Sequence, residues 1–304
     1  MLDYSLRVNT MKPGVQFDRS ARTEESAPPS ADLSQVLQEK YQELRKILMD
    51  ARRVLVAFSG GVDSSLVAKI AFDILGPENT LAVIAISPSL GSDEEHEALA
   101  LLNEIGLPYR TIETHEVEDA DYSANPINRC YFCKTHVYGA LRAVAEECGC
   151  EMIVDGFNAD DSGEYRPGRK AGSELAVRSP LADVGLRKDE IRELARHLGL
   201  SNWAKPPMAC LSSRVEYGIR ITPKILTQVD RAEAALRRLG FNDLRVRHHD
   251  KLARIEVNES MIDAVTARRE EIIQAIKAAG YTYVTVDLQG LRHGSMNEVL
   301  LSRG

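Results

Sequence analysis

The stretch that decides the fold reads Ser59-Gly-Gly-Val-Asp-Ser-Ser65. Before it lies the apolar run 53–58, which predicts a buried parallel strand, and after it the apolar spacing predicts a helix over 66–75. Glycines at a strand-to-helix turn let the backbone approach an anion closely, and the first N–H groups of the helix add partial positive charge. The pattern therefore predicts a phosphate site. A tight turn before a capped helix is the alternative.

Length and composition are those of an ordinary globular protein. The chain has 304 residues, of which 44% are hydrophobic and 27% charged, enough for roughly two domains. The net charge of -7 argues against a nucleic-acid partner, although a local basic patch could exist. No apolar stretch approaches the roughly 18 residues that span a bilayer, and the N-terminus has no secretory apolar region, so we expect a cytoplasmic protein without a membrane partner.

The order of apolar segments predicts a tail and two domains. Residues 1–33 are rich in small, polar and Pro residues and predict a disordered tail. Alternating strands and helices over 34–205 predict an α/β domain, a doubly wound parallel sheet with ligands at the carboxyl ends of its strands. The expected strands are 53–58, 81–86, 109–113 and 152–155, and the expected helices are 33–49, 66–75, 92–105, 134–147 and 188–198.

After residue 205 the pattern changes to β-α-β-β-α-β, which predicts a smaller α+β domain over 206–304 for substrate binding or oligomerisation. Its expected strands are 217–221, 244–249, 252–257 and 281–286, and its expected helices are 223–239 and 260–279.

Five cysteines, an odd number, do not indicate a disulfide framework and favour metal or redox chemistry. Cys130 and Cys133 form a Cys-x-x-Cys in a predicted loop that opens a helix, and Cys210 lies at the predicted domain junction. Cys148 and Cys150 precede a predicted strand. Free cysteines are common small core residues, so a structural role is favoured for this pair.

Three arrangements of these thiols remain open. A zinc site could use Cys130, Cys133, Cys148 and Cys150 in a closed tetrahedron. Cys130, Cys133 and Cys210 could instead hold three irons of a 4Fe-4S cluster and leave the fourth iron open. The third arrangement is a bare redox pair at Cys130 and Cys133.

The heptapeptide 59–65 resembles the PP-loop of the ATP pyrophosphatase superfamily, which includes GMP synthetase, NAD synthetase, asparagine synthetase and tRNA-thiolating enzymes. It is not a Walker A sequence, because no Gly-Lys-Ser/Thr follows the glycines. The resemblance implies an adenine nucleotide alpha hydrolase-like fold, cleavage of ATP between the α and β phosphates, and Mg²⁺ to neutralise charge.

Further residues are expected at the ATP site. Ser87 ends the strand along which the adenine would lie, and Lys188 would reach the phosphates, as the superfamily resemblance implies. A solvated lysine at the start of a helix is the alternative for Lys188. Asp160 and Asp161 offer hard oxygens for Mg²⁺, with a solvated loop as the alternative. The residues expected to bind ATP and Mg²⁺ are therefore Ser59, Gly60, Gly61, Val62, Asp63, Ser64, Ser65, Ser87, Asp160, Asp161 and Lys188.

Three further motifs resemble one branch of the superfamily: Asn128-Arg-Cys-Tyr-Phe-Cys-Lys134, Pro206-Pro-Met-Ala-Cys-Leu-Ser-Ser-Arg214 and Leu244-Arg-Val-Arg-His-His249. Over about 35–300 the chain is similar to the LarE family of ATP-dependent sulfur transferases, which build the nickel-pincer nucleotide. This implies adenylylation of a pyridinium dicarboxylate mononucleotide and replacement of carboxylate oxygen by sulfur. It implies Cys210, Asp63 and Lys188 as catalytic residues. The Cys-x-x-Cys is similar to the branch with a 4Fe-4S cluster, here on Cys130, Cys133 and Cys210.

Such a substrate carries a phosphate and carboxylates, for which Arg214, Arg245 and Arg247 are suitable bidentate partners. Arg245 and Arg247 share one strand face, so an exposed basic strand edge is the alternative. Glu233 is either a pocket carboxylate or a helix-surface residue. We expect a small-molecule nucleotide as substrate and a homo-oligomer.

Three rival functions remain open. A tRNA-thiolating enzyme would need a basic groove, against which the acidic balance argues. An ammonia-using amide synthetase would have no use for three well-placed cysteines. A nucleotide-sensing, zinc-stabilised binding module would not release AMP from ATP.

Overall fold

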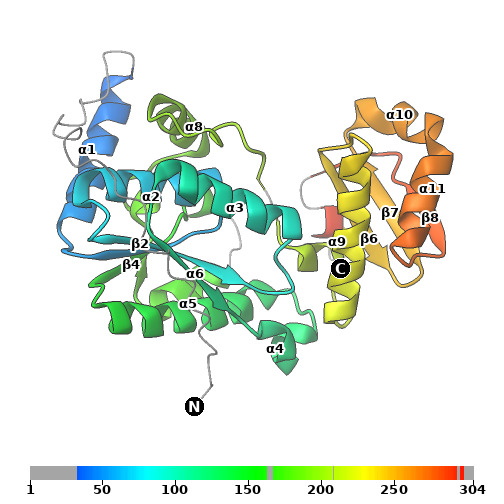
Figure 1. The fold of residues 1–304 in the computed structure, drawn as a ribbon, viewed down its shortest axis with the longest axis horizontal. Coiled ribbons are helices and arrows are strands. Elements are labelled where there is room, and N and C mark those ends of the chain that lie inside the picture. The colour runs from blue at the N-terminus through cyan, green and yellow to red at the C-terminus, as the bar shows by residue number, and fades with distance from the viewer. Residues whose placement is uncertain (1–32, 163–166, 208, 293–294, 298–304) are drawn as a thin grey trace. The chain divides into compact units, whose positions relative to one another are not determined.

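The computed structural model describes residues 33–162, 167–207, 209–292 and 295–297, so the predicted tail lies outside it except for the buried Leu33. The described chain forms two compact units (Figure 1). The first comprises residues up to 86, 94–114 and 130–207, and the second comprises 87–93, 115–129 and the residues from 209. The predicted division between 205 and 206 stays a prediction.

The first unit contains a five-stranded parallel sheet, which confirms the predicted doubly wound fold. The strand order is β3-β2-β1-β4-β5, with bounds β1 (Val54–Ala57), β2 (Thr80–Ile86), β3 (Tyr109–Glu113), β4 (Met152–Val154) and β5 (Val177–Arg178). β1 pairs with both β2 and β4. The chain adds β2 and β3 on one side of β1 and then returns to add β4 and β5 on the other side. Ligands of such sheets bind at this switch point, beside the carboxyl ends of the strands.

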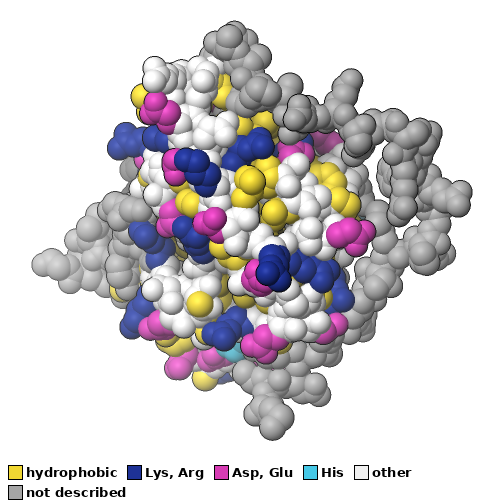
Figure 2. All heavy atoms as spheres, turned by 90° about the vertical axis from the view of Figure 1, so that its left-hand side faces the viewer, with side chains coloured by type: hydrophobic (Ala, Val, Ile, Leu, Met, Phe, Trp, Pro, Cys, Tyr) yellow, Lys and Arg dark blue, Asp and Glu magenta, His cyan; other side chains and the backbone are white. Residues whose placement is uncertain are grey.

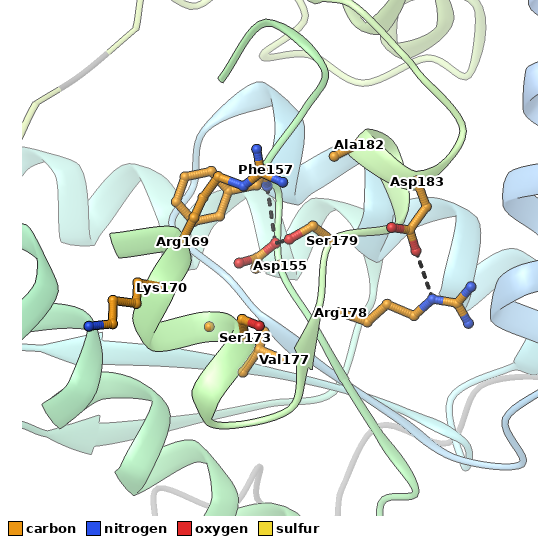
Figure 3. A pocket seen from close by; sticks show the side chains of 11 residues that line it. Asp155, Phe157, Arg169, Lys170, Ser173, Val177, Arg178, Ser179, Ala182 and Asp183 are labelled. Carbon is orange, nitrogen blue, oxygen red and sulfur yellow. Dashed lines mark hydrogen bonds and ion pairs between the residues drawn. The ribbon is translucent and has the colours of Figure 1, made fainter. Parts of the chain in front are cut away.

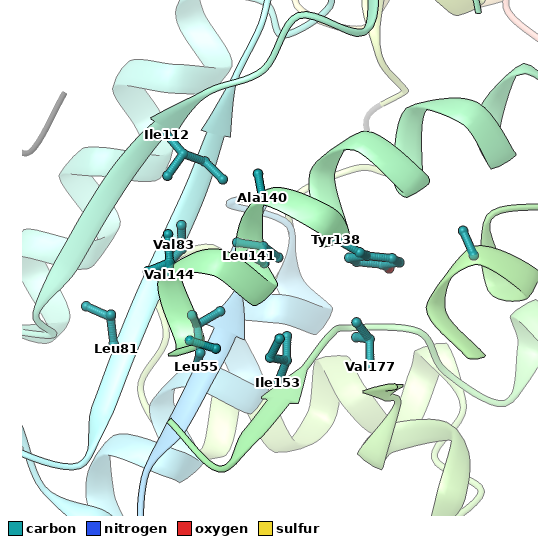
Figure 4. Close-up of a cluster of buried hydrophobic side chains, with 12 residues drawn as sticks. Leu55, Leu81, Val83, Ile112, Tyr138, Ala140, Leu141, Val144, Ile153 and Val177 are labelled. Atoms are coloured by element: carbon teal, nitrogen blue, oxygen red, sulfur yellow. The ribbon is translucent and has the colours of Figure 1, made fainter. Parts of the chain in front are cut away.

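Helices cover both faces of this sheet (Figure 1). One face carries α1 (Gln35–Met49), α2 (Val62–Leu75), α3 (Ser92–Ile105) and α8 (Lys188–His197), and the other carries α5 (Arg129–Cys148) and α6 (Pro167–Glu174). Tyr138, Leu141 and Val144 of α5 recur at helical spacing and pack on Leu55 and Ile153 of the strands (Figure 4). Fully burying one such aliphatic side chain stabilises the fold by about 1.5–3 kcal/mol.

The second unit contains a second, smaller sheet, as predicted, with strand order β6-β7-β8. β6 (Leu244–His249) and β7 (Leu252–Val257) are antiparallel, and β8 (Tyr283–Val286) is parallel to β7. Its helices are α9 (Pro223–Arg238), α10 (Ile262–Ala267) and α11 (Arg269–Ala278). Leu236, Val246, Ile255 and Ile276 belong to one hydrophobic core between these elements.

The remaining helical elements are short. They are η1 (Glu116–Glu118), α4 (Ala120–Ser123), η2 (Asp160–Ser162), α7 (Pro180–Asp183), η3 (Leu211–Arg214), η4 (Glu259–Met261) and η5 (Ser295–Asn297).

The predicted strand 217–221 was wrong. Near this segment, Val215 forms an isolated bridge to His248 of β6. The carbonyls of Glu216 and Ile219 accept hydrogen bonds from the side chain of Asn125, and Ile221 N donates to Ser123 O. These tertiary partners take the backbone groups that a strand would use.

Two helix predictions also need correction. α5 begins at Arg129 instead of 134, so Cys130 and Cys133 lie in its first turns and not in a loop. The predicted helix 260–279 is divided into η4, α10 and α11. The break between α10 and α11 lies at Arg268, whose backbone leaves the helical region.

The surface carries charges of both signs. Figure 2 draws one face of the molecule, on which Lys and Arg side chains are interspersed with Asp and Glu. Within the described ranges, no helix is both long enough and apolar enough to cross a membrane.

Candidate active site

The PP-loop lies at the switch point of the sheet, between β1 and α2. α2 begins at Val62, inside the heptapeptide, and Gly61 is its N-cap residue without a side-chain hydrogen bond. The first N–H groups of a helix have no partner within the helix, and they carry partial positive charge. The loop therefore presents an uncapped helix N-terminus to an anion.

The serines of the loop hold its backbone. Ser64 and Ser65 are buried, and their hydroxyls donate to Gly61 O at 3.2 and 2.8 Å. Ser59 Oγ lies 3.1 Å from Ser64 Oγ. These side chains stiffen the loop, and their predicted contact with ATP stays a prediction.

Asp63 and Lys188 form an ion pair beside the loop. Lys188 Nζ lies 2.7 Å from Asp63 Oδ1. Burial raises the pKa of the Asp63 carboxyl above its usual value, while the charge of Lys188 opposes this shift and that of Asp161 adds to it. The start of α8, which carries Lys188, is held by Glu190, whose Oε2 accepts Arg187 N at 2.8 Å. The structure thus brings both predicted catalytic residues of this unit together.

The loop after β4 completes this corner. Asp160 Oδ2 accepts Lys188 N at 2.8 Å, and Asp161 Oδ2 accepts Asn158 N at 3.1 Å. Both predicted Mg²⁺ ligands therefore lie beside the Asp63–Lys188 pair. Sequence reasoning missed Gly156, where an added Cβ would lie 2.6 Å from Ser64 N. Its position directly after a buried strand was the available signal, because only glycine permits so close an approach.

Sequence reasoning also missed two residues that follow α8. Asn202 Nδ2 donates to Ser65 Oγ at 3.0 Å and to Gly60 O at 3.3 Å. Lys205 Nζ lies 3.3 Å from Gly60 O and 2.8 Å from Glu97 Oε2. The sequence pattern around Lys205 indicates only a domain boundary, yet in the structure Lys205 brings a second cation to the PP-loop.

A pocket of about 630 Å³ opens at the carboxyl ends of β4 and β5 (Figure 3). Its wall includes Asp155, which accepts hydrogen bonds from Tyr138 Oη and Ser179 Oγ, each at 2.7 Å. Burial, followed by the charge of Asp155, raises the pKa of Tyr138, so this phenol remains a donor. Arg169 and Lys170 are exposed at the rim.

The second unit carries the predicted substrate residues. Glu233 is fully buried and pairs with Arg214 Nε at 2.9 Å and with Arg237 at 3.0 Å. Its Oε1 also accepts Val246 N at 3.0 Å. Glu233 is therefore not a helix-surface residue but the centre of a buried ionic network.

Arg247 and Arg245 differ although they share a strand face. Arg247 is 2% exposed and binds Glu256 at 2.8 Å, so it is not part of an exposed strand edge. Arg245 is half-buried and, within the described residues, pairs with no carboxylate. Burial, then the charges of Arg247 and Arg214, lower its pKa. The structure brings all four predicted substrate residues together and leaves Arg245 as the cation most available to an anion.

On the hypothesis that Arg245 binds an anionic group of the substrate, Arg245→Ala is expected to raise the substrate KM about 10-fold or more with unchanged ATP affinity, because a charge-assisted contact worth about 1.5–3 kcal/mol would be lost. Arg247→Ala is expected to lower the free energy of unfolding by about 1.5–3 kcal/mol instead, because it removes a charged hydrogen bond to the buried Glu256, which keeps Arg254 and Ser295 as partners. Steady-state kinetics and urea unfolding of both variants measure this contrast. Equal destabilisation by the two substitutions would contradict it.

Ser87 lies in the second unit, in a chain of hydrogen bonds. Its Oγ is 2.7 Å from Ser89 Oγ, which donates to the buried Glu116 at 2.7 Å. Ser89 O accepts Leu211 N at 2.9 Å and so holds the residue after Cys210. The predicted contact of Ser87 with adenine stays a prediction.

All five cysteines are described, and none forms a disulfide. Cys130 is exposed and Cys133 half-buried on α5, while Cys210 is half-buried in the second unit. Cys148 and Cys150 pack against the core of the first unit, and burial raises the pKa of Cys150. Among the described residues, no three His, Cys, Asp or Glu side chains are grouped so that they could hold a metal ion.

Comparisons with known proteins decide the family. A family model described as NAD synthase matches residues 30–133. The chain is 43% identical over 267 residues to an uncharacterized protein of Synechocystis sp., covering 87% of this chain and 99% of that protein. It is 38% identical over 261 residues to the pyridinium-3,5-bisthiocarboxylic acid mononucleotide synthase of Lactiplantibacillus plantarum, covering 86% of this chain and 95% of that enzyme. The chain belongs to the LarE family.

Membership in the LarE family confirms the predicted PP-loop transferase, an ATP-dependent enzyme that makes a sulfur-containing product. A more limited likeness extends to a component of the glutamine-hydrolyzing GMP synthase of Methanococcus maripaludis, which is 31% identical over 175 residues, 54% of this chain and 55% of that protein. The LarE relatives match most of the chain, including the second unit, whereas the GMP synthase component matches only about half of it.

Proposed function

We propose that this LarE chain adenylylates a pyridinium dicarboxylate mononucleotide with ATP and then exchanges a carboxylate oxygen for sulfur. The relative from Lactiplantibacillus plantarum is named as the synthase of a bisthiocarboxylic acid mononucleotide. One structural observation carries the proposal furthest. η3 follows Cys210 directly, and its Arg214 belongs to the same buried network as Glu233, so a sulfur-bearing residue adjoins the anion-binding arginines within one unit.

In the first step, a substrate carboxylate oxygen forms a bond to the α-phosphorus of ATP. The bond from that phosphorus to the bridging oxygen breaks, and pyrophosphate leaves with the electron pair. The uncapped start of α2 and the cations Lys188 and Lys205 stabilise the charge that develops on pyrophosphate. Arg245 and its neighbours hold the anionic groups of the nucleotide.

In the second step, a sulfur nucleophile forms a bond to the acyl carbon. The acyl carbon–oxygen bond to AMP breaks, and AMP leaves with the electron pair, so no oxidant or reductant is needed. The nucleophile is sulfide, and Cys210, on the segment next to Arg214, would hold the source of that sulfide near the acyl carbon while its own carbon–sulfur bond stays intact. This step distinguishes the enzyme from the amide synthetases, which use a nitrogen nucleophile.

One or two of the carboxylates of Asp63, Asp160 and Asp161, together with the phosphates of ATP, would hold Mg²⁺. Their carboxylate oxygens are the hard donors that this ion prefers. The raised pKa of Asp63 also fits, because a bound cation would stabilise its ionised form. Mg²⁺ supplies neutralisation of phosphate charge, while Lys188 orients Asp63.

Cys130, Cys133 and Cys210 are proposed to hold the 4Fe-4S cluster. Two observations support thiolate ligation: none of these thiols is in a disulfide, and Cys130 and Cys133 are neighbours three positions apart on one helix. When bound by three thiolates, such a cluster supplies an open iron position for sulfide. Cys148 and Cys150, packed against the core, do not take part.

The adenylylation step predicts AMP and pyrophosphate as the products of ATP. Chromatography of nucleotides after incubation with the pyridinium dicarboxylate mononucleotide measures this, and a reaction without that substrate is the control. AMP formed in proportion to product supports the proposal. ADP as the main product would overturn it, and absence of any substrate-dependent AMP would favour a binding module.

The cluster predicts a division among the five cysteines. Alanine at Cys130, Cys133 or Cys210 should each remove bound iron and acid-labile sulfide from anaerobically purified protein, because each removes one thiolate ligand. Alanine at Cys148 or Cys150 is the matched control and should retain both. Stoichiometric zinc without labile sulfide would contradict the cluster, and so would conversion of Cys210 to dehydroalanine after one turnover.

A further inference from the structure

We propose that Asn125 is a positioning residue that holds the Cys210 segment and the start of the Cys130–Cys133 helix on one side chain. This inference rests on the proposed role of these cysteines in sulfur transfer. Asn125 is 0% exposed and touches neither ATP nor substrate in the proposed mechanism. Its effect on the reaction passes through the two cysteine-bearing segments.

The amide nitrogen of Asn125 holds the segment that follows Cys210. Its Nδ2 donates to three backbone carbonyls, at 3.3 Å to Val215, 2.8 Å to Glu216 and 3.1 Å to Ile219. The carbonyl of Asn125 also accepts Gly218 N at 3.1 Å. One residue therefore organises the backbone of the whole turn 215–219.

The amide oxygen of Asn125 holds the start of α5. Its Oδ1 accepts a hydrogen bond from the guanidinium of Arg129, the first residue of that helix. Arg129 is 4% exposed, and its guanidinium lies over the ring of Tyr217, 5.9 Å from the centroid. Arg129 thus contacts the same turn both directly and through Asn125.

Chain connectivity links these contacts to the thiols. Cys130 directly follows Arg129, and Cys210 lies five residues before Val215. The intervening η3 is fixed as well, since Tyr122 Oη lies 2.6 Å from Ser212 Oγ in a buried contact. A shift of Asn125 would therefore be transmitted to both cysteine-bearing segments.

The backbone conformation and the side-chain contacts at position 125 explain why the residue is an asparagine. Its backbone is left-handed, with φ of +55°, a conformation that asparagine tolerates better than other non-glycine residues. Its side chain must donate at one end and accept at the other, which an amide does. Aspartate would place a carboxylate against three carbonyl oxygens, and glycine would keep the backbone conformation but supply neither group.

The experiment compares Asn125→Gly with Asn258→Gly, which removes an exposed helix-capping asparagine of the same unit. The readouts are alkylation rates of Cys130 and Cys210 by iodoacetamide in the metal-free folded protein, iron bound after reconstitution, and substrate-dependent ATP–pyrophosphate exchange. For Asn125→Gly we expect alkylation of the half-buried Cys210 about tenfold faster, an altered alkylation rate at the exposed Cys130, about tenfold less bound iron and near-normal exchange. Asn258→Gly should match wild type in all three.

A second variant covers the case in which Asn125→Gly does not fold. Arg129→Gln removes the guanidinium contacts to Asn125 and Tyr217 but keeps the hydrogen bonds from Asn125 Nδ2 to the turn, so it should change the alkylation rate of Cys130 more than that of Cys210. Wild-type thiol reactivity in both variants would overturn the positioning role. If wild-type protein binds no iron and transfers no sulfur, the proposed function fails, while the alkylation rates still test Asn125 by themselves.

Discussion

Gly60→Ala is expected to lower ATP cleavage by about 100-fold or more while the protein stays folded. The backbone of Gly60 has φ of +71°, and an added Cβ would lie 2.7 Å from Ala98 Cβ on α3. A left-handed non-glycine residue costs about 1–2 kcal/mol and overpacking about 1–3 kcal/mol. The loop must move to relieve both, and the N–H groups that are proposed to bind the phosphates would move with it.

Gly61→Ala is the matched control for this change. Its φ is -77°, and an added Cβ would lie 3.5 Å from its nearest neighbour, Ser59 Oγ, which is an ordinary contact. We expect less than about a tenfold loss. Rates of AMP formation and thermal unfolding of both variants measure the difference. Similar losses in the two would show that the close approach of the loop to α3 does not matter.

Cys210→Ala is expected to reduce sulfur transfer by about 1,000-fold or more, because it removes a thiolate that is proposed to hold the source of the transferred sulfide. Substrate-dependent ATP–pyrophosphate exchange should stay close to wild type. The contacts that Cys210 makes are through its carbonyl, which accepts Ser213 N at 2.9 Å and the Arg214 guanidinium at 3.2 Å, so alanine keeps them. The variant should therefore fold and accumulate the acyl-adenylate.

Mass spectrometry of the nucleotide product, together with the exchange assay, separates the two half-reactions. Cys148→Ala is the control, because Cys148 packs against the core of the first unit. Thiocarboxylate formed by Cys210→Ala at the wild-type rate would show that another group delivers the sulfur. Loss of exchange as well would place Cys210 in adenylylation.

Local patterns predicted the regular elements closely. The strands 244–249 and 252–257 and the helix 92–105 have the predicted bounds, because periods of two and 3.6 are properties of a short stretch of chain. The start of α5 and the irregular turn 215–219 were missed. Both depend on Asn125, which is distant in sequence from residues 215–219. Hydrogen bonds over such separations leave no periodic signal.

For the site, the sequence by itself determined the position of the PP-loop, since its two glycines stand where a buried strand turns into a helix. It also determined which arginines gather near β6. Tertiary structure decided which of them is available: the register of β6 on β7 places Glu256 opposite Arg245, yet the buried Glu256 carboxylate pairs with Arg247, and Arg245 has no such pair among the described residues. Charge pairing depends on which side chains are neighbours in three dimensions and on how deeply they are buried. The sequence of one strand specifies neither.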